Sequence, residues 1–230
     1  MIRNPAYHIG KQVSGAIYIP DYLANPLCQP LIPMVEEELN ALEWVTKRTA
    51  RSEYFMSETE RTYSYGNKGT GEESYTSKPF TRNVNALRET LNLEFDTQFN
   101  VCFLNKYDDQ HQFLGWHADQ FDGMREDQPI FVMSFGAVRE IWVKPKFSPC
   151  PDCSGVGYDD SVAVGEKCQT CNGEGKIPTK GVVPDDQKFA LAVGSLFIMP
   201  EGYQDTHLHK IPKHPQPCGP RISLTFRSFK

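Results

Sequence analysis

The sequence lacks any long hydrophobic run. None of its 230 residues falls in an apolar stretch long enough to cross a bilayer, and the first 15 residues contain no apolar signal core. We therefore expect a soluble, cytoplasmic or otherwise intracellular protein with no membrane association, and we expect it to be a monomer.

Positive charge is also scarce, because 24 Lys and Arg stand against 29 Asp and Glu and give a net charge of −5. This balance argues against non-specific electrostatic binding along an extended stretch of nucleic acid, because such binding needs many lysine and arginine contacts to phosphate. It allows a local basic surface. Apolar residues make up 39% of the chain. That content suits one well-buried domain, which we expect to span residues 1–230.

Four of the seven cysteines stand in two copies of the pattern C-x-x-C-x-G-x-G, as Cys150, Cys153, Cys168 and Cys171. Four thiolates at this spacing form a closed tetrahedral Zn(II) site, and the paired glycines let each knuckle turn. The repeats resemble the cysteine-rich motifs of J-domain chaperones. We predict a zinc-knuckle insertion over residues 146–180 that the metal staples together, with contact to a partner or to nucleic acid as the alternative role.

Two segments, 30–45 and 81–93, carry apolar residues at helical spacing and predict amphipathic helices, the second with Thr81 as its N-cap. Residues 51–80 are polar and rich in Gly, Ser and Tyr, which is typical of a long surface excursion. From Phe99 onward the chain consists of short, β-branched or aromatic strand-like segments without helices between them. The fold class predicted is α+β but mainly β: an antiparallel barrel or double-sheet jelly roll with N-terminal packing helices.

The stretch "LGWHADQFDG" places His117 and Asp119 one residue apart. Residues two apart in an extended chain face the same side, so imidazole and carboxylate can reach one ion and supply two of the ligands of a 2-His-1-carboxylate Fe(II) site. A solvated loop is the plain alternative, and a third ligand must come from elsewhere. His207, His209 and His214 are candidates, and periodicity does not choose between His207 and His209.

The last strand-like segment, residues 221–227, alternates apolar side chains with a polar face that carries Arg221 and Arg227 at its ends. Buried cations need anionic partners, so the two guanidiniums predict a small dicarboxylate co-substrate.

Residues 99–107 also present one face, which is apolar from Phe99 to Phe103 and ends in the amide of Asn105 and the phenol of Tyr107. Both polar groups can donate hydrogen bonds to a carboxylate. An ordinary strand end at a turn is the alternative interpretation.

Taken in order, Asn105-x-Tyr107, His117-x-Asp119, "SFGAVRE", "HKIP" and "PRISLTFR" resemble the AlkB family of Fe(II)/2-oxoglutarate dioxygenases, over about residues 99–229. The resemblance implies a double-stranded β-helix, which is a jelly roll. It implies three iron ligands, with the histidine of "HKIP" as the third: His117, Asp119 and His209. It also implies that 2-oxoglutarate is bound by Asn105, Tyr107, Arg221 and Arg227.

By the same resemblance, Arg221 would pair with the distal carboxylate of 2-oxoglutarate, and Arg227 would support the keto-acid end and Asp119. His207 would be a neighbour on the rim. The family oxidises 2-oxoglutarate to succinate and CO2 while it hydroxylates a C–H bond, and a hydroxylated N-methyl group leaves as formaldehyde. We therefore expect dealkylation repair of N-alkylated bases in nucleic acid, with DNA as the expected substrate.

Two alternatives remain open. One is a 2-oxoglutarate-dependent hydroxylase of a normal or modified base, of RNA or of protein. The other is a non-catalytic zinc-binding adaptor, and the intact set of iron and 2-oxoglutarate residues argues against it.

Residues 51–80 occupy the place of the family's nucleotide-recognition lid, where aromatic rings would flank a flipped base. Related repair enzymes often carry an acid about two residues beyond the aspartate of H-x-D, whereas this chain has Gln120 and Phe121 before Asp122. Base preference therefore stays open, and the aromatic residues have the alternative role of pinning a loop to the body. The substrate-lid residues that we expect are Tyr54, Phe55, Tyr63, Tyr65, Phe121 and Asp122.

Overall fold

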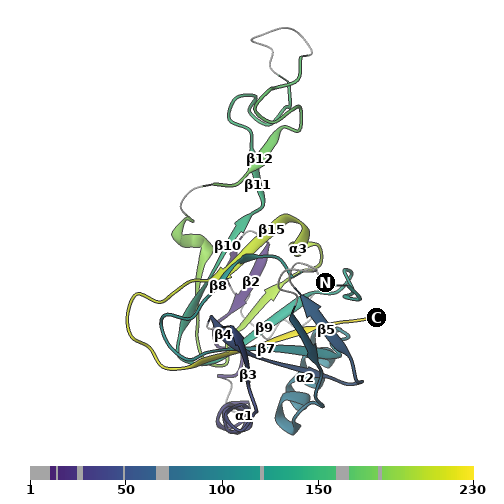
Figure 1. Cartoon of the computed structure of the whole chain (residues 1–230), viewed down its shortest axis with the longest axis vertical. Helices are drawn as coiled ribbons and strands as arrows, with labels where there is room; N and C mark the ends of the chain where they lie inside the picture. Colours follow the sequence, from purple (N-terminus) through teal and green to yellow (C-terminus); the bar gives the residue numbers. More distant parts are fainter. Residues whose placement is uncertain are drawn as a thin grey trace.

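The computed structural model describes residues 11–13, 15–24, 28–48, 50–65, 73–119, 122–158, 166–180 and 183–230. Two antiparallel sheets face each other, and a narrow hairpin projects away from them (Figure 1). Among the described residues, no helix is both long and apolar enough to cross a membrane. The layered β architecture confirms the predicted jelly roll.

The larger sheet has eight strands in the order β1-β2-β14-β9-β16-β7-β4-β3. Every neighbouring pair is antiparallel. The strands are β1 (Lys11–Val13), β2 (Ala16–Ile19), β14 (Leu196–Met199), β9 (Ile130–Gly136), β16 (Arg221–Arg227), β7 (Val101–Tyr107), β4 (Arg51–Ser57) and β3 (Val45–Arg48).

The smaller sheet has four strands in the order β13-β10-β15-β8. These are β13 (Lys188–Leu191), β10 (Arg139–Pro145), β15 (His207–Ile211) and β8 (Leu114–His117). Two separate hairpins complete the β structure: β5 (Thr62–Tyr65) with β6 (Glu73–Thr76), and β11 (Phe147–Pro149) with β12 (Lys176–Pro178).

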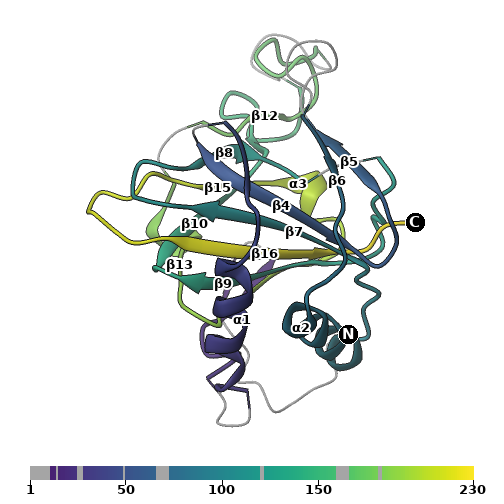
Figure 2. The same cartoon turned by 60° about the horizontal axis from the view of Figure 1, so that its bottom comes forward.

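Three helices and one short 3-10 turn are described: α1 (Leu31–Asn40), α2 (Arg82–Phe95), α3 (Tyr203–Thr206) and η1 (Asp185–Gln187). Helices α1 and α2 cover the outer face of the larger sheet (Figure 2). Because side chains alternate along a strand, β16 sends Leu224 and Phe226 to this helical layer and its polar residues to the space between the sheets.

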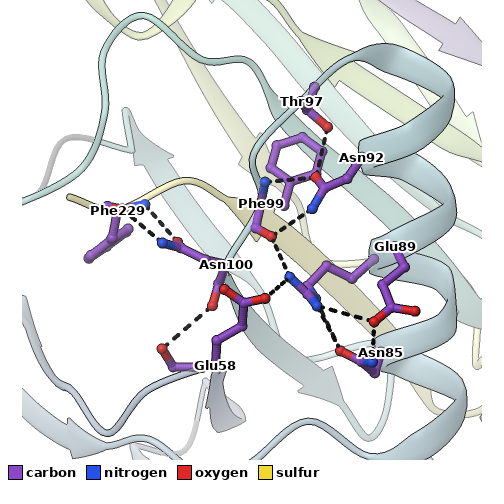
Figure 3. Close-up of polar contacts among 10 residues, drawn as sticks. Glu58, Asn85, Glu89, Asn92, Thr97, Phe99, Asn100 and Phe229 are labelled. Atoms are coloured by element: carbon purple, nitrogen blue, oxygen red, sulfur yellow. Dashed lines mark hydrogen bonds and ion pairs between the residues drawn. The ribbon is translucent and has the colours of Figure 1, made fainter.

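Hydrogen bonds from side chains of α2 to the backbone of Phe99 fix where β7 begins (Figure 3). The Asn92 amide accepts a bond from the Phe99 N–H at 2.7 Å and donates to the Phe99 carbonyl at 2.9 Å. The buried Arg88 donates to the same carbonyl at 2.9 Å and pairs with Glu58. Asn100 bonds the backbone of Phe229 at 2.8 Å in both directions. Phe99 is thereby held ahead of the strand.

The structure revises several expectations. The first helix ends at Asn40 rather than at residue 45, because Val45 pairs with Glu53 in the sheet. The second extends to Phe95, and Thr81 stands at its N-cap without a capping side-chain bond. Phe99 packs in the helical layer and not on the face of Asn105, because it precedes β7.

The interpretation of residues 51–80 as a surface excursion is wrong for β4, which lies inside the larger sheet and pairs with β7 over its whole length. The segment reads as polar because it contains Glu53, yet this carboxylate is buried, forms an ion pair with Arg51 and accepts a hydrogen bond from Tyr75. Buried polar groups with partners resemble surface groups when only the sequence is read.

Candidate active site and zinc cluster

Two strands of the smaller sheet bring the expected metal ligands together. His117 ends β8, Asp119 follows it, and His209 on β15 stands directly opposite His117 in the register. One ligand atom from each of the three residues lies within 4.8 Å of the others. A single ion can therefore contact all three, with other coordination positions left for co-substrates.

The site chemistry suits a cation. Burial alone would raise the pKa of Asp119, but Arg227 and the two imidazoles hold it well below its usual range, so the carboxylate is ionised. Burial, together with His117, lowers the pKa of His209 to about 3, which keeps its ring neutral. His117 Nδ1 lies 2.9 Å from the Gly115 carbonyl, which fixes the ring and leaves Nε2 toward Asp119.

His207 lies apart from this group. Its ring stacks on Tyr203 with a centroid distance of 4.5 Å and an interplanar angle of 9°, and its Nδ1 lies 2.9 Å from Thr206 Oγ1. His214 Nδ1 lies 2.8 Å from the Gln216 carbonyl at the surface. Of the three candidate histidines, only His209 joins the ligand cluster.

Two buried residues orient Asp119. Arg227 Nη2 lies 2.8 Å from Asp119 Oδ2, the contact that the family resemblance implies. Gln204 on α3 accepts a bond from the Asp119 backbone N–H at 2.8 Å. Nothing in the sequence signals this role for Gln204, because it lies 85 residues from Asp119 and belongs to no recognisable motif.

A cavity of about 400 Å³ lies between the sheets, a size typical of small-molecule sites. The seven residues expected to bind iron and 2-oxoglutarate all line it: Asn105, Tyr107, His117, Asp119, His209, Arg221 and Arg227. Ser223 and Thr225 complete the polar face of β16, and Phe103, Val132 and Ile141 contribute apolar walls.

Arg221 fits an acidic co-substrate. Its side chain is fully buried, and Nη2 donates to Ser134 Oγ at 2.9 Å, whereas Nε and Nη1 have no hydrogen-bond partner. Burial, with a smaller contribution from Arg139, lowers the pKa of the guanidinium to about 10. A buried cation with two unused donors is costly unless an anion joins it, so the residues present fit a carboxylate.

Arg51 and Glu53 on β4 form a network that the sequence did not reveal. Arg51 lines the cavity, and its Nε donates to Asn105 Oδ1 at 2.8 Å while its Nη2 lies 2.6 Å from Glu53 Oε1. The Tyr75 hydroxyl donates to the other Glu53 oxygen. Because Arg51 occupies the amide oxygen of Asn105, the amide nitrogen is the group left to donate to an acceptor in the cavity.

The expected lid residues have different positions. Tyr63 lines the cavity, and Phe55 is buried beneath it with a ring distance of 5.3 Å. Tyr54 packs against Trp44 on the opposite face of the sheet, which does not fit a role in the lid. Asp122 is exposed and does not line the cavity. The Tyr65 side chain and Phe121 lie outside the described residues.

The four knuckle cysteines form a compact buried cluster, and none of the seven cysteines of the chain is in a disulfide. The Sγ atoms of Cys150 and Cys168 are 3.8 Å apart, and those of Cys153 and Cys171 are 3.7 Å apart. Regular tetrahedral Zn(II) with 2.3 Å bonds to sulfur places its ligands about 3.8 Å from each other. The cluster therefore has the dimensions of a closed zinc site.

Backbone amides support the thiolates. The N–H groups of Gly157 and Gly175 donate to the sulfurs of Cys153 and Cys171 at 3.3 and 3.2 Å. Burial raises the pKa of Cys153, but the N–H groups of Gly157 and Gly155 outweigh it and lower the pKa to about 7. A Cβ at Gly157 would lie 2.5 Å from the Gly173 carbonyl oxygen, so the two knuckles approach too closely for a side chain there.

Comparison with known proteins agrees with this geometry. The family model described as the 2OG-Fe(II) oxygenase superfamily matches residues 15–227. Over 131 residues the chain is 29% identical to the DNA oxidative demethylase ALKBH2 of Arabidopsis thaliana, a match that covers 57% of this chain and 38% of that protein. Over 209 residues it is 26% identical to the human alpha-ketoglutarate-dependent dioxygenase alkB homolog 3, covering 90% and 61%.

The chain thus spans less than two thirds of the length of these relatives. The solved structure of OsALKBH1 superposes with a TM-score of 0.53 and 14% identity, covers 96% of this chain and 99% of that one, and supports the fold. The chain belongs to the 2OG-Fe(II) oxygenase superfamily, a family of dioxygenases that use Fe(II), 2-oxoglutarate and O2, and it is similar in sequence to AlkB homologues of that superfamily.

Proposed function

We propose that the chain catalyses Fe(II)- and 2-oxoglutarate-dependent oxidative demethylation of N-alkylated bases in nucleic acid, with DNA as the expected substrate. One observation carries the proposal: a single cavity combines a two-histidine, one-carboxylate ligand set with a buried arginine that has two unused donors. The choice of DNA as the expected substrate is supported by similar proteins that are named DNA oxidative demethylase.

His117, Asp119 and His209 would hold Fe(II). The bound metal supplies O2 activation, coupled to the conversion of 2-oxoglutarate to succinate and CO2 and to transfer of one oxygen atom into a C–H bond. Arg227 keeps Asp119 ionised and in place through its 2.8 Å contact, and Gln204 fixes the backbone of the same residue. Asp119 is thereby oriented before any ion arrives.

Arg221 would pair with the distal carboxylate of 2-oxoglutarate through Nε and Nη1, since Ser134 already accepts from Nη2. Tyr107 lies beneath the guanidinium, 5.6 Å from it, and burial raises the pKa of its phenol, which stays protonated and able to donate. Asn105 is oriented by Arg51 to donate its amide N–H. These contacts select a small dicarboxylate over a monoacid.

A methylated base would enter from the open side of the cavity with Tyr63 against it. The overall reaction consumes the N–CH3 group, 2-oxoglutarate and O2 and yields N–CH2OH, succinate and CO2. The C–N bond of the hydroxymethyl group then breaks with its electron pair going to the nitrogen, the hydroxyl proton is transferred to that nitrogen, and formaldehyde leaves. Both steps balance in atoms without a further reductant.

We also propose that the whole chain forms one dioxygenase domain, with a zinc-knuckle insertion at residues 146–180. The S–S distances and the amide bonds to sulfur support zinc, and the projection of the β11–β12 hairpin away from the sheets supports an insertion (Figure 1). Zinc would stabilise this segment, because its described residues, 146–158 and 166–180, have little apolar core besides the cysteines and Ile177.

Mass spectrometry of an oligonucleotide panel tests the function. Matched DNA and RNA strands, each with one N-methylated base or none, are incubated with Fe(II), 2-oxoglutarate and air, with Asp119→Ala as the inactive control. The proposal expects loss of one methyl group with equal amounts of succinate and formaldehyde. A retained hydroxyl on a base would support the hydroxylase alternative instead, and absence of succinate formation under all conditions would contradict the enzyme assignment.

A further inference from the structure

The outer face of the smaller sheet carries alternating lysine and tryptophan side chains. Trp142 on β10 stands opposite Lys188 on β13 and opposite Lys210 on β15. The ammonium of Lys210 lies 4.2 Å from the Trp142 ring centroid and 4.9 Å from that of Trp116 on β8. Lys188 lies 4.7 Å from Trp142 and Lys144 lies 4.8 Å from Trp116. We call these five residues the lysine–tryptophan ladder.

The ladder lies behind the cavity. On each strand its residues alternate with residues that face inward: His117 follows Trp116, His209 precedes Lys210, and Val143 separates Trp142 from Lys144. Four strands at about 4.8 Å spacing make a face about 14 Å wide. Strand β8 is the edge of this sheet, and the His117 side chain keeps 27% of its exposure there, so the cavity opens beside the ladder.

The three ammonium groups are close enough to influence one another. Burial lowers the pKa of Lys210, and the charges of Lys144 and Lys188 lower it further. Two acids lie nearby: Glu140 accepts a bond from the Trp142 ring N–H at 2.7 Å, and the exposed Asp185 pairs with Lys188 at 2.7 Å. An exposed ion pair such as that of Lys188 with Asp185 is weak, so a polyanion can readily replace the aspartate as the partner of the lysine.

The basic surface continues onto the projecting hairpin. Lys144 donates to the Thr179 carbonyl at 3.0 Å, at the base of that hairpin. Farther along, Lys176 lies 5.0 Å from the ring of Phe147, which is 45% exposed. Surfaces that bind single-stranded nucleic acid without sequence preference carry positive charge that follows the phosphate backbone, and the lysines of the ladder and of the hairpin supply such charge.

We propose that the lysine–tryptophan ladder binds the phosphate backbone of single-stranded nucleic acid that extends beyond the base held in the cavity. The inference rests on the proposed function, because it takes the polyanion to be the substrate strand. Because ammonium groups already cover the tryptophan rings, the role of the rings is to hold the lysines in place. The lysine charges make the contact with the phosphates. The chain thereby binds a polyanion in spite of its net charge of −5.

The test measures binding of an unmodified, fluorescently labelled single-stranded DNA to the full-length protein over a range of salt concentrations. The triple variant Lys144→Gln/Lys188→Gln/Lys210→Gln is expected to bind more weakly and to reduce the slope of log K against log salt by about 2, at about 0.7 per lost phosphate contact. Lys210→Arg keeps the charge and should retain binding. Lys106→Gln is the matched control, since Lys106 lies 6.0 Å from the Trp44 ring and belongs to the larger sheet.

A second readout separates this inference from the function on which it rests. Turnover of a methylated nucleoside, which carries no phosphate for the ladder to bind, should be the same in the triple variant and the wild type, whereas KM for a long methylated strand should rise. Wild-type protein that demethylates neither substrate would refute the proposed function, while the unmodified strand still tests the ladder. An unchanged salt slope in the folded triple variant, or equal binding of poly-glutamate and DNA, would overturn the ladder proposal.

Discussion

Replacement of Arg221 tests whether this arginine stabilises the fold or binds 2-oxoglutarate. The lowering of its pKa from 12.5 to about 10 corresponds to roughly 3 kcal/mol by which the cavity disfavours the charge. In Arg221→Met, removal of this penalty is offset by loss of the Ser134 hydrogen bond and of the Tyr107 stacking, about 1 kcal/mol each. Without 2-oxoglutarate, the variant should therefore be as stable as the wild type or about 1 kcal/mol more stable.

With 2-oxoglutarate the order should reverse. Leaving the distal carboxylate buried without its partner costs about 3–5 kcal/mol, which is roughly a 10²- to 10⁴-fold loss of affinity. Calorimetric titration of 2-oxoglutarate into protein loaded with Mn(II), which supports no turnover, gives the affinity directly. Urea unfolding with and without 2-oxoglutarate gives the stability.

Arg139→Met is the matched control, because Arg139 also lies against the Tyr107 ring, at 5.7 Å, and is also buried. Its guanidinium donates to the backbone carbonyls of Asp109, Gln112 and Pro212. This variant should lose stability and keep its 2-oxoglutarate affinity wherever it folds. The reasoning fails if Arg221→Met binds 2-oxoglutarate within tenfold of the wild type, or if it loses 3 kcal/mol of stability without the ligand.

His209→Ala should lose tight Mn(II) binding in equilibrium dialysis and His207→Ala should keep it, because only His209 lies in the ligand cluster; the opposite result would exchange their roles. Arg51→Met should weaken 2-oxoglutarate binding by about tenfold, since one hydrogen bond that orients Asn105 is lost, and unchanged calorimetric affinity would show that the amide needs no support. Cys150→Ser should release zinc to a colorimetric chelator and lower the melting temperature, while the folded fraction still binds Mn(II). Loss of Mn(II) from that folded fraction would show that the zinc insertion supports the cavity.

Strand periodicity placed Arg221 and Arg227 on one face of β16, because alternation is a local property of the backbone, and in the structure that face lines the cavity. It misplaced Phe99, which precedes β7 and packs in the helical layer. The choice of His209 over His207 came from a resemblance rather than from periodicity. The structure supplies its physical reason in the register, which puts His209 opposite His117 and leaves His207 against Tyr203.

The residues that sequence reasoning missed depend on contacts between distant segments. Arg51 meets Asn105 across 54 residues, and Gln204 meets the Asp119 backbone across 85. No periodicity in the sequence marks a polar residue as buried when its partner is distant in the chain. The sequence therefore predicts the segment that forms β4 to be part of the surface. Tyr54 lies on the face of β4 that packs against the helical layer, away from the cavity. The sequence prediction assigns several aromatic residues of this segment to the lid together, without regard to the face of the strand on which each lies.

We propose that one cavity binds Fe(II) through three side chains and 2-oxoglutarate beside it. Anaerobic titration of the Fe(II)-loaded protein with 2-oxoglutarate examines both ligands at once, because binding of the keto acid to Fe(II) produces a visible charge-transfer absorption band that needs no nucleic acid. We predict a saturable band with one Fe(II) per chain in the wild type and in His207→Ala, and none in Asp119→Ala. Absence of the band in the wild type, or its persistence in folded Asp119→Ala, would contradict the account.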